Sequence, residues 1–188
     1  MKDWAREVHI LGECLERLTV WDADGKDVEP DRGFEIWIEQ VVHIREHKGT
    51  VFFIGNGASA SMASHFAADL GKNAQVRTQT FYDLSLLTAI GNDISFDAVF
   101  SEPLRRCLSK GDMVIAISSS GESPNILEGV RTAAEGNGYV VTLSAMKPEN
   151  RLRRLGQINF YVPAKKYGPA ETAHAAILHF WLDHVMTA

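Results

Sequence analysis

The fold is decided by residues 113–125, which read MVIAISSSGESPN. The first five of these, Met113 to Ile117, form an apolar run with the length and composition of a buried strand. Ser123 followed by Pro124 predicts the start of a helix, because serine favours the N-cap and proline favours the first helical position. This stretch therefore predicts a strand, a serine-rich loop and a helix in direct succession.

Similar runs recur along the chain. We predict further strands at 51–54, 139–143 and 158–162, a more polar strand at 76–81, and helices at 58–72, 96–109, 123–136 and 171–186. Apolar strands that alternate with helices are typical of parallel βαβ units with helices on both faces. The chain is therefore predicted to be α/β, a three-layer α/β/α sandwich with a five-stranded parallel sheet.

The first fifty residues differ from the rest because they carry no buried strand run. Residues 2–20 place Trp4, Val8, Leu11, Leu15 and Leu18 at 4-3-4-3 spacing, which is typical of a helix that packs along another helix. A second helix is predicted at about 31–48. Between them, residues 22–27 superficially resemble a calcium loop, but the spacing and the closing Glu are missing, so a polar turn is favoured. We predict one domain, 1–188, with residues 1–50 as an N-terminal helical extension.

Composition excludes several classes of protein. The chain has 188 residues, 45% of them hydrophobic and 23% charged, with a formal net charge of -5. No apolar run approaches the ~20 residues of a membrane span, and Lys and Arg form no long stripe for nucleic acid.

The mixed-charge start of the chain lacks the apolar segment of a signal peptide, so a cytoplasmic location is expected. Cys14 and Cys107 lack a CxxC partner and are interpreted as two buried, reduced thiols.

The loop after Ile117 is a candidate phosphate site. It offers the hydroxyls of Ser118, Ser119, Ser120 and Ser123 at the point where a strand ends and a helix begins. Free backbone N–H groups and the positive end of the helix dipole at such a point suit a dianionic phosphate. The alternative is a serine-rich turn that only caps the helix. The loop is not a Walker motif, because no Lys follows the glycine.

Two further patterns carry chemistry-bearing residues. The loop at 55–59, GNGAS, also joins a strand to a helix, and its glycines permit close approach of a ligand. On that helix His65 and Asp69 are four residues apart, which fits a metal pair but fits a hydrogen-bonded surface pair better. On the last helix Glu171 and His179 fall within about 80° of each other. His43, His174 and His184 are interpreted as ordinary surface or core histidines.

These motifs together resemble a known family. The segments are 55–59 (GNGAS), 65–70 (HFAADL), 91–93 (GND), 118–125 (SSSGESPN), Glu171 and His179. They are similar to the phosphoheptose isomerases, which are sugar isomerase (SIS) domain proteins with a flavodoxin-like sandwich. Members interconvert sedoheptulose 7-phosphate and D-glycero-D-manno-heptose 7-phosphate, a step in heptose synthesis for surface glycans.

The resemblance implies a role for each matching residue. Substrate binding is implied for Asn56, Gly57, Ala58, Asn92, Asp93, Ser118, Ser119, Ser120, Ser123 and Glu171, and proton transfer for Asp69 and His179. The positions that hold zinc in the family are His65, Asp69, Glu171 and His179, and two imidazoles with two carboxylates form a sensible Zn²⁺ shell. One Zn²⁺ per subunit and a homotetramer with shared active sites are expected, with residues 1–50 packing in the oligomer.

The chain departs from the family pattern at four places. Asp69 stands where the family has Glu, and Glu171 where it usually has Gln. Ala58 replaces a common Gly, and Gly168 and Pro169 replace charged residues. These changes leave open an isomerase of another sugar phosphate, another SIS reaction such as a lyase, or a non-catalytic SIS protein that binds a phosphosugar and acts through a protein partner.

Overall fold

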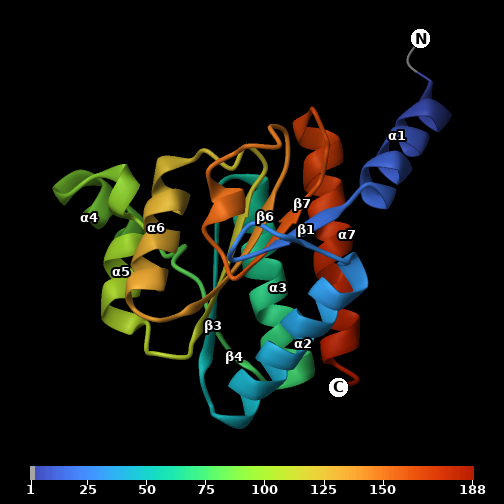
Figure 1. Cartoon of the computed structure of the whole chain (residues 1–188). Coiled ribbons are helices and arrows are strands. Elements are labelled where there is room, and N and C mark those ends of the chain that lie inside the picture. Colours follow the sequence, from blue (N-terminus) through green and yellow to red (C-terminus); the bar gives the residue numbers. More distant parts are fainter. Residues whose placement is uncertain (1–2) are drawn as a thin grey trace.

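The computed structural model describes residues 3–188 (Figure 1). The helices are α1 (Trp4–Glu16), α2 (Pro30–Glu46), α3 (Ala58–Ala74), α4 (Leu84–Asp93), α5 (Ser101–Cys107), α6 (Pro124–Glu135) and α7 (Tyr167–Val185), with 3-10 turns η1 (Phe96–Ala98) and η2 (Leu152–Arg154). The strands are β1 (Thr19–Asp22), β2 (Asp27–Val28), β3 (Thr50–Gly55), β4 (Arg77–Gln79), β5 (Met113–Ser118), β6 (Tyr139–Ser144) and β7 (Ile158–Tyr161).

Within residues 3–188 the strands form one seven-stranded sheet in the order β2-β1-β7-β6-β5-β3-β4. The five predicted strands are present and parallel, as β3 to β7. When only these five strands are numbered in chain order, their order across the sheet is 2-1-3-4-5, which is the flavodoxin-like order. The α/β prediction is confirmed, but the strand number was wrong, because β1 and β2 add a hairpin antiparallel to β7.

The hairpin also corrects the helix predicted over residues 2–20. That helix spans only Trp4–Glu16, and Lys2 lies outside the described residues. In the hairpin turn, the Asp22 carboxylate accepts from the backbone N–H groups of Asp24 and Lys26 at 2.9 Å each. The acidic stretch is therefore a polar turn, as the sequence favoured.

The side chain of Arg153 connects this hairpin to the rest of the domain. The guanidinium of Arg153, in η2, lies 3.5 Å from the ring centre of Trp21 and 4.3 Å from that of Tyr161. It also donates to the hydroxyl of Thr19 at 2.8 Å. Burial lowers the pKa of Arg153, but the nearby aromatic and acidic groups offset part of this effect.

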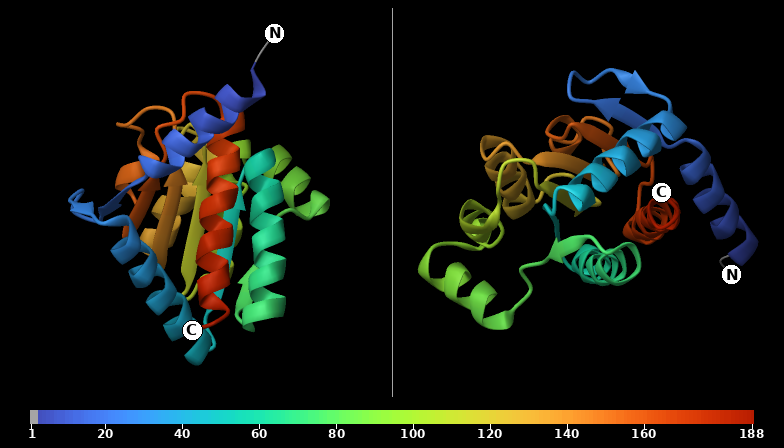
Figure 2. Two further views of the ribbon diagram at one scale, coloured as in Figure 1. Left: turned by 90° about the vertical axis from the view of Figure 1, so that its right-hand side faces the viewer. Right: turned by 90° about the horizontal axis from the view of Figure 1, so that it is seen from below.

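Helices cover both faces of the sheet, as Figures 1 and 2 show. Successive strand residues point to opposite faces, so Phe53 packs with α2, α3 and α7 while Phe52 packs with α4, α5 and α6. On the first face, the rings of Trp37 and Trp181 stack with centroids 4.3 Å apart. These two cores fix α3, α6 and α7 against the sheet, and each of these helices begins at the carboxyl ends of the strands.

Two smaller predictions were wrong. The helix expected over 96–109 is divided into η1 and α5, and α4 precedes it unpredicted. Of the two cysteines, both free in the described chain, Cys14 is buried but Cys107 is exposed. In residues 3–188, no helix has the length and apolar character that crossing a membrane requires.

Candidate functional site

A pocket of about 240 Å³ opens at the carboxyl ends of β3 and β5. These neighbours are the strands where the order of the sheet reverses, which is where ligands bind in such folds. The pocket is lined by Asn56, Gly57, Ala58, Ser59, Ile117, Ser118, Ser119, Ser120, Ser123, Tyr167 and Glu171. Both loops selected from the sequence therefore form a single site.

The serine loop is held in shape by its own backbone. The N–H of Gly121 donates to the carbonyl of Ser118 at 3.0 Å, and Gly121 itself has φ +63, which favours glycine. A Cβ at Gly121 would lie 2.0 Å from Oδ1 of Asn150, so the position also lacks room for a side chain. The loop is thus fixed before any ligand arrives.

Two hydroxyls of the loop keep bonding capacity for a ligand. Ser119 is buried, and its Oγ lacks a partner among the described residues although it lines the pocket. Ser123 is the N-cap residue of α6, as predicted, but in the described chain its side chain makes no capping hydrogen bond. Its Oγ lies 3.4 Å from that of Ser118. Because a buried polar group without a partner costs free energy, the Ser119 hydroxyl favours a hydrogen-bonding ligand. The Ser123 hydroxyl is only partly buried.

The first loop is tied to the serine loop by an amide pair. Asn56 and Asn125 exchange two hydrogen bonds of 2.9 Å through their side chains. The hydroxyl of Tyr82 donates to the carbonyl of Gly55 at 3.0 Å, and burial raises the pKa of Tyr82. Gly57, at φ +57, then starts α3. The N-termini of α3, α6 and α7 converge here, and their dipoles favour an anion.

Three of the predicted side chains meet farther along α3 and α7. Nε2 of His65 lies 3.4 Å from Oδ2 of Asp69. The ring centroids of His65 and His179 are 5.7 Å apart, and Phe66 contacts His179 edge-on. His65 and His179 are exposed and Asp69 is partly buried. The predicted pair is therefore formed, and a second helix brings His179 to it.

Glu171 is the fourth predicted metal donor. It lines the pocket from α7, eight residues before His179, which is about 12 Å along a helix. Among the described residues, one group of three or more His, Cys, Asp or Glu side chains has ligand atoms within 4.8 Å of one another. It consists of His43, Glu46 and His47. The four predicted metal donors do not converge to that degree in the single chain.

Asn92 and Asp93 lie elsewhere. They are exposed at the end of α4, where the Asn92 amide donates to the Asp93 carboxylate at 2.8 Å. They do not line the pocket of the serine loop, as far as residues 3–188 define it. Figures 1 and 2 both show α4 on the flank away from α7.

Sequence reasoning missed several pocket residues. Tyr167 lines the pocket at the first position of α7, and Ser59 lies in the first turn of α3. Asn125 supports the first loop although it was read only as part of the serine motif. A signal for Ser59 and Asn125 was present, since both lie at predicted helix starts beside the two loops. Nothing in the apolar pattern marked Tyr167.

The chain is similar to known SIS-domain proteins. The family model for the SIS domain matches residues 30–145. The chain is 33% identical over 156 residues to the phosphoheptose isomerase of Dechloromonas aromatica, covering 79% of this chain and 80% of that one. It is 30% identical over 184 residues to that of Citrifermentans bemidjiense, covering 95% and 94%.

Among solved structures, the fold is similar to that of the phosphoheptose isomerase from Neisseria gonorrhoeae. The TM-score is 0.85 at 25% identity, and the match covers 98% of this chain and 97% of that one. The similarity thus extends over the helices outside the SIS match as well. On these grounds the chain belongs to the phosphoheptose isomerase family of SIS-domain proteins.

Proposed function

We propose that this protein interconverts sedoheptulose 7-phosphate and D-glycero-D-manno-heptose 7-phosphate, and so feeds heptose synthesis for surface glycans. The observation that carries the proposal is the arrangement along α3 and α7. The serine pocket lies at the start of both helices, and His65, Asp69 and His179 lie beyond it on the same pair. Figure 2 shows the two helices side by side.

This arrangement fits a substrate whose phosphate and reacting carbons lie at opposite ends. From Ser59 to His65, and from Glu171 to His179, the helices advance about 9 and 12 Å. A heptose 7-phosphate carries its phosphate on C7 and reacts at C1 and C2. With the phosphate on the serine hydroxyls and helix N-termini, an extended chain directs C1 and C2 toward Asp69 and His179.

The reaction needs a base at carbon and an acid at oxygen. Starting from the ketose, a base removes a proton from C1, the C–H electrons form the C1=C2 bond, and O2 gains a proton, which gives the enediol. Return of a proton to C2 and loss of the O1 proton gives the aldose. We assign these transfers to the carboxylate of Asp69 and the imidazole of His179. Asn56, Gly57 and Ala58 are assigned to the sugar.

A divalent metal ion, one Zn²⁺ per subunit, is part of the proposal. The donors His65, Asp69, Glu171 and His179 are nitrogen and oxygen ligands that suit Zn²⁺. Glu171 lines the same pocket as the phosphate loop, and a carboxylate facing a dianionic phosphate repels it unless a cation intervenes. When bound, such an ion would polarise the substrate oxygens. Side-chain rotation must first bring the donors closer together.

The assembly is proposed to be a homotetramer with shared active sites. Asn92 and Asp93 are exposed on α4 and, as far as residues 3–188 define it, do not line the serine pocket of their own chain. In a tetramer, a neighbouring copy would supply them to the pocket wall. The packing of residues 1–50 in the oligomer and the cytoplasmic location stay predictions from the sequence.

One observation favours a second function, a non-catalytic protein that binds a phosphosugar. The serine pocket is preformed, whereas the four donors do not converge within residues 3–188. Binding without turnover would need only the pocket. Retention of all four ligating side chains favours the enzyme.

The deciding experiment is an isomerase assay with sedoheptulose 7-phosphate on chelated protein, with and without added Zn²⁺. Metal-dependent formation of heptose 7-phosphate is expected, with Asp69→Ala and His179→Ala each inactive but folded by circular dichroism. Full activity in either variant would contradict the assigned residues. Binding of the sugar phosphate without conversion by folded, metal-loaded protein would establish the second function instead.

A further inference from the structure

A second group of metal-ligating side chains lies outside the candidate active site. His43, Glu46 and His47 occupy the last turn of α2, and one ligand atom from each lies within 4.8 Å of the other two. All three are exposed in the single chain, although they belong to residues 1–50, which are expected to pack in the oligomer. The turn leads into the start of β3, whereas the serine pocket opens at the far end of that strand. Six strand residues, about 20 Å, separate the two places.

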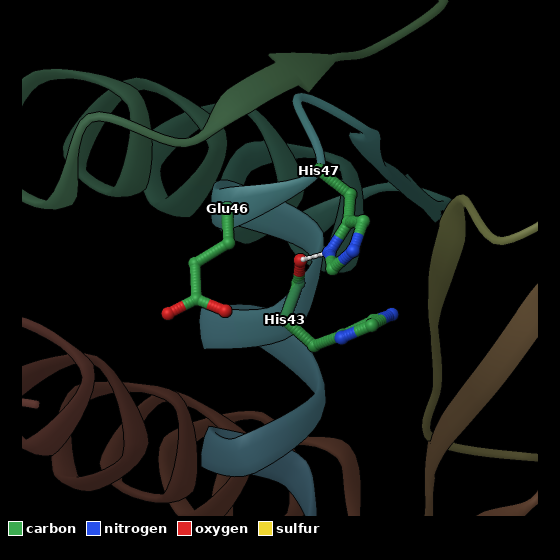
Figure 3. A group of neighbouring side chains, drawn as sticks. All are labelled: His43, Glu46 and His47. Atoms are coloured by element: carbon green, nitrogen blue, oxygen red, sulfur yellow. Dashed lines mark hydrogen bonds between the residues drawn. The ribbon is translucent and has the colours of Figure 1, made fainter.

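The spacing of the two histidines suits chelation of one ion. Residues four apart lie on one face of a helix, and the ring centroids of His43 and His47 are 4.0 Å apart. Figure 3 shows both imidazoles on one side of the helix and the Glu46 side chain extending from the other side. Ligands at ~2.1 Å from one ion lie roughly 3–3.5 Å apart. To bind one ion, these exposed side chains must therefore rotate toward one another.

One hydrogen bond prepares His47 as a ligand. Nδ1 of His47 lies 2.8 Å from the backbone carbonyl oxygen of His43 (Figure 3). A carbonyl oxygen only accepts, so Nδ1 carries the proton and the lone pair of the neutral ring is on Nε2. Metal-bound histidines in proteins have this arrangement, in which the second nitrogen donates to a carbonyl or carboxylate.

The charges around the group act in both directions. The group lies at the C-terminus of a 17-residue helix, the negative end of its dipole. The adjacent arginine, Arg45, donates instead to the carbonyl of Ala188 at 3.0 Å, and Arg77 donates to that of Lys48 at 3.0 Å. Both guanidinium groups keep their positive charge in these hydrogen bonds, so the three metal-ligating side chains must offset their repulsion of a metal ion.

We propose that His43, Glu46 and His47 form a peripheral site for one divalent transition-metal ion. Two imidazoles and a carboxylate suit Zn²⁺, Ni²⁺ or Cu²⁺, whereas Mg²⁺ and Ca²⁺ prefer oxygen ligands only. Three protein ligands leave a coordination position for water or for a donor from another molecule. This site is independent of the metal proposed for the isomerase reaction.

The test measures Zn²⁺ binding by equilibrium dialysis on untagged, full-length protein that carries His65→Ala and His179→Ala. These changes remove both imidazoles of the proposed active site, so the count reports the peripheral site. One Zn²⁺ per chain is expected. Adding His43→Ala and His47→Ala should weaken binding at least about tenfold, and should abolish the Zn²⁺-dependent rise in unfolding temperature.

The chain offers a matched control. His184 is also exposed on a helix, and its Nδ1 lies 2.7 Å from the carbonyl of Phe180, but it is not part of the three-donor group. His184→Ala should leave Zn²⁺ affinity unchanged, and Mg²⁺ should not compete. Equal Zn²⁺ binding with and without His43 and His47, or equal losses from His184→Ala, would overturn the proposal.

Discussion

At the scale of single residues, the carboxylate of Asp69 is the most informative group. Its Oδ2 lies 3.4 Å from Nε2 of His65, and Nζ of Lys72 lies 3.9 Å from its Oδ1. The side chain is one methylene shorter than the Glu found at this position in the family pattern. In the proposed reaction, its reach toward C1 of the sugar is therefore what decides the efficiency of proton transfer.

Two substitutions at Asp69 distinguish the effect of side-chain length from the effect of charge. Asp69→Glu should retain or raise kcat with sedoheptulose 7-phosphate, because the carboxylate is kept and extended. Asp69→Asn should lower kcat at least about 100-fold, which is the usual contribution of a positioned base. Steady-state kinetics at saturating Zn²⁺ measures both. Equal kcat for Asn and Asp at this position would remove Asp69 from the reaction.

A second residue-scale prediction concerns His174, which is fully buried on α7. Neither ring nitrogen makes a hydrogen bond within the described chain. Burial lowers its pKa to about 4, and the nearby backbone of Ser144 offsets only part of this effect. Because the unfolded chain binds the proton near pH 6.5 and the folded chain does not, stability is full above pH 6.5 and falls as pH drops toward 4.

The expected loss from this group is about 3 kcal/mol of unfolding free energy between pH 6.5 and pH 4. Urea unfolding at several pH values measures it. His174→Leu supplies the comparison, because an apolar side chain at the same buried position cannot titrate. The difference in stability between wild type and variant should change by this amount across the interval. A constant difference would show that folding does not lower the pKa of His174.

At the scale of elements, the serine loop depends on one glycine. Gly121→Ala forces a non-glycine residue to φ +63 and places its Cβ against Asn150. We expect a loss of about 1–3 kcal/mol in unfolding free energy. Weaker binding of inorganic phosphate should accompany it, since the loop must shift. Chemical denaturation and calorimetric titration give the two values.

Gly12 is the matched control for that substitution. It lies within α1, and a Cβ there would meet open space. Gly12→Ala should therefore leave phosphate binding unchanged and stabilise the helix by up to about 1 kcal/mol. If both alanine variants behaved alike, the strain at Gly121 would not be what shapes the loop.

The helices and strands differ in how far the sequence predicts them. Four of the parallel strands, β3, β5, β6 and β7, and the helices α3, α6 and α7 followed from apolar periodicity, because each buries a continuous face, whereas no residue of β4 is buried. β1 has only four residues, Thr19–Asp22, and is joined to β2 by an acidic turn, so its pairing depends on the edge of β7. α4 has a capping residue, Asp83, which accepts from Leu86 at 3.0 Å. That cap was a readable signal, but only one residue of α4 is buried.

The candidate site also has parts that the local sequence predicts and parts that it does not. The serine loop and the His65–Asp69 pair were predictable, since each lies within a single element or turn. The approach of His179 to His65 depends on how α3 and α7 pack, which no local pattern contains. The convergence at His43 and His47 was readable from their i, i+4 spacing, but the bond that orients His47 was not.

At the scale of the whole molecule, two apolar areas lie on projecting elements. Trp4, on α1, is 79% exposed. On the other flank, around α4 and η1, Leu84 and Phe96 are 74% and 62% exposed. Figure 1 shows both elements standing out from the sandwich. Exposed apolar groups of this size are typical of protein interfaces, and α4 also carries Asn92 and Asp93.

If a neighbouring copy supplies α4 to the serine pocket, two inactive variants should complement each other. Asp69→Ala removes the proposed base, and Asp93→Ala removes the α4 carboxylate from every site of its own oligomer. In a mixed oligomer, some sites combine the intact Asp69 of one chain with the intact Asp93 of another. About a quarter of the sites should then be complete, for random mixing of equal amounts.

The experiment unfolds the two variants together, refolds them as a mixture, and compares isomerase activity with that of each variant refolded alone. Recovered activity near that fraction of wild type would place the two carboxylates of one site on different chains. Asp97→Ala is the control partner, because Asp97 is exposed on the neighbouring turn η1 and carries no proposed role; this variant should be active by itself. No recovery, from a mixture that light scattering finds to be assembled, would mean that one chain supplies both residues or that Asp93 does not take part.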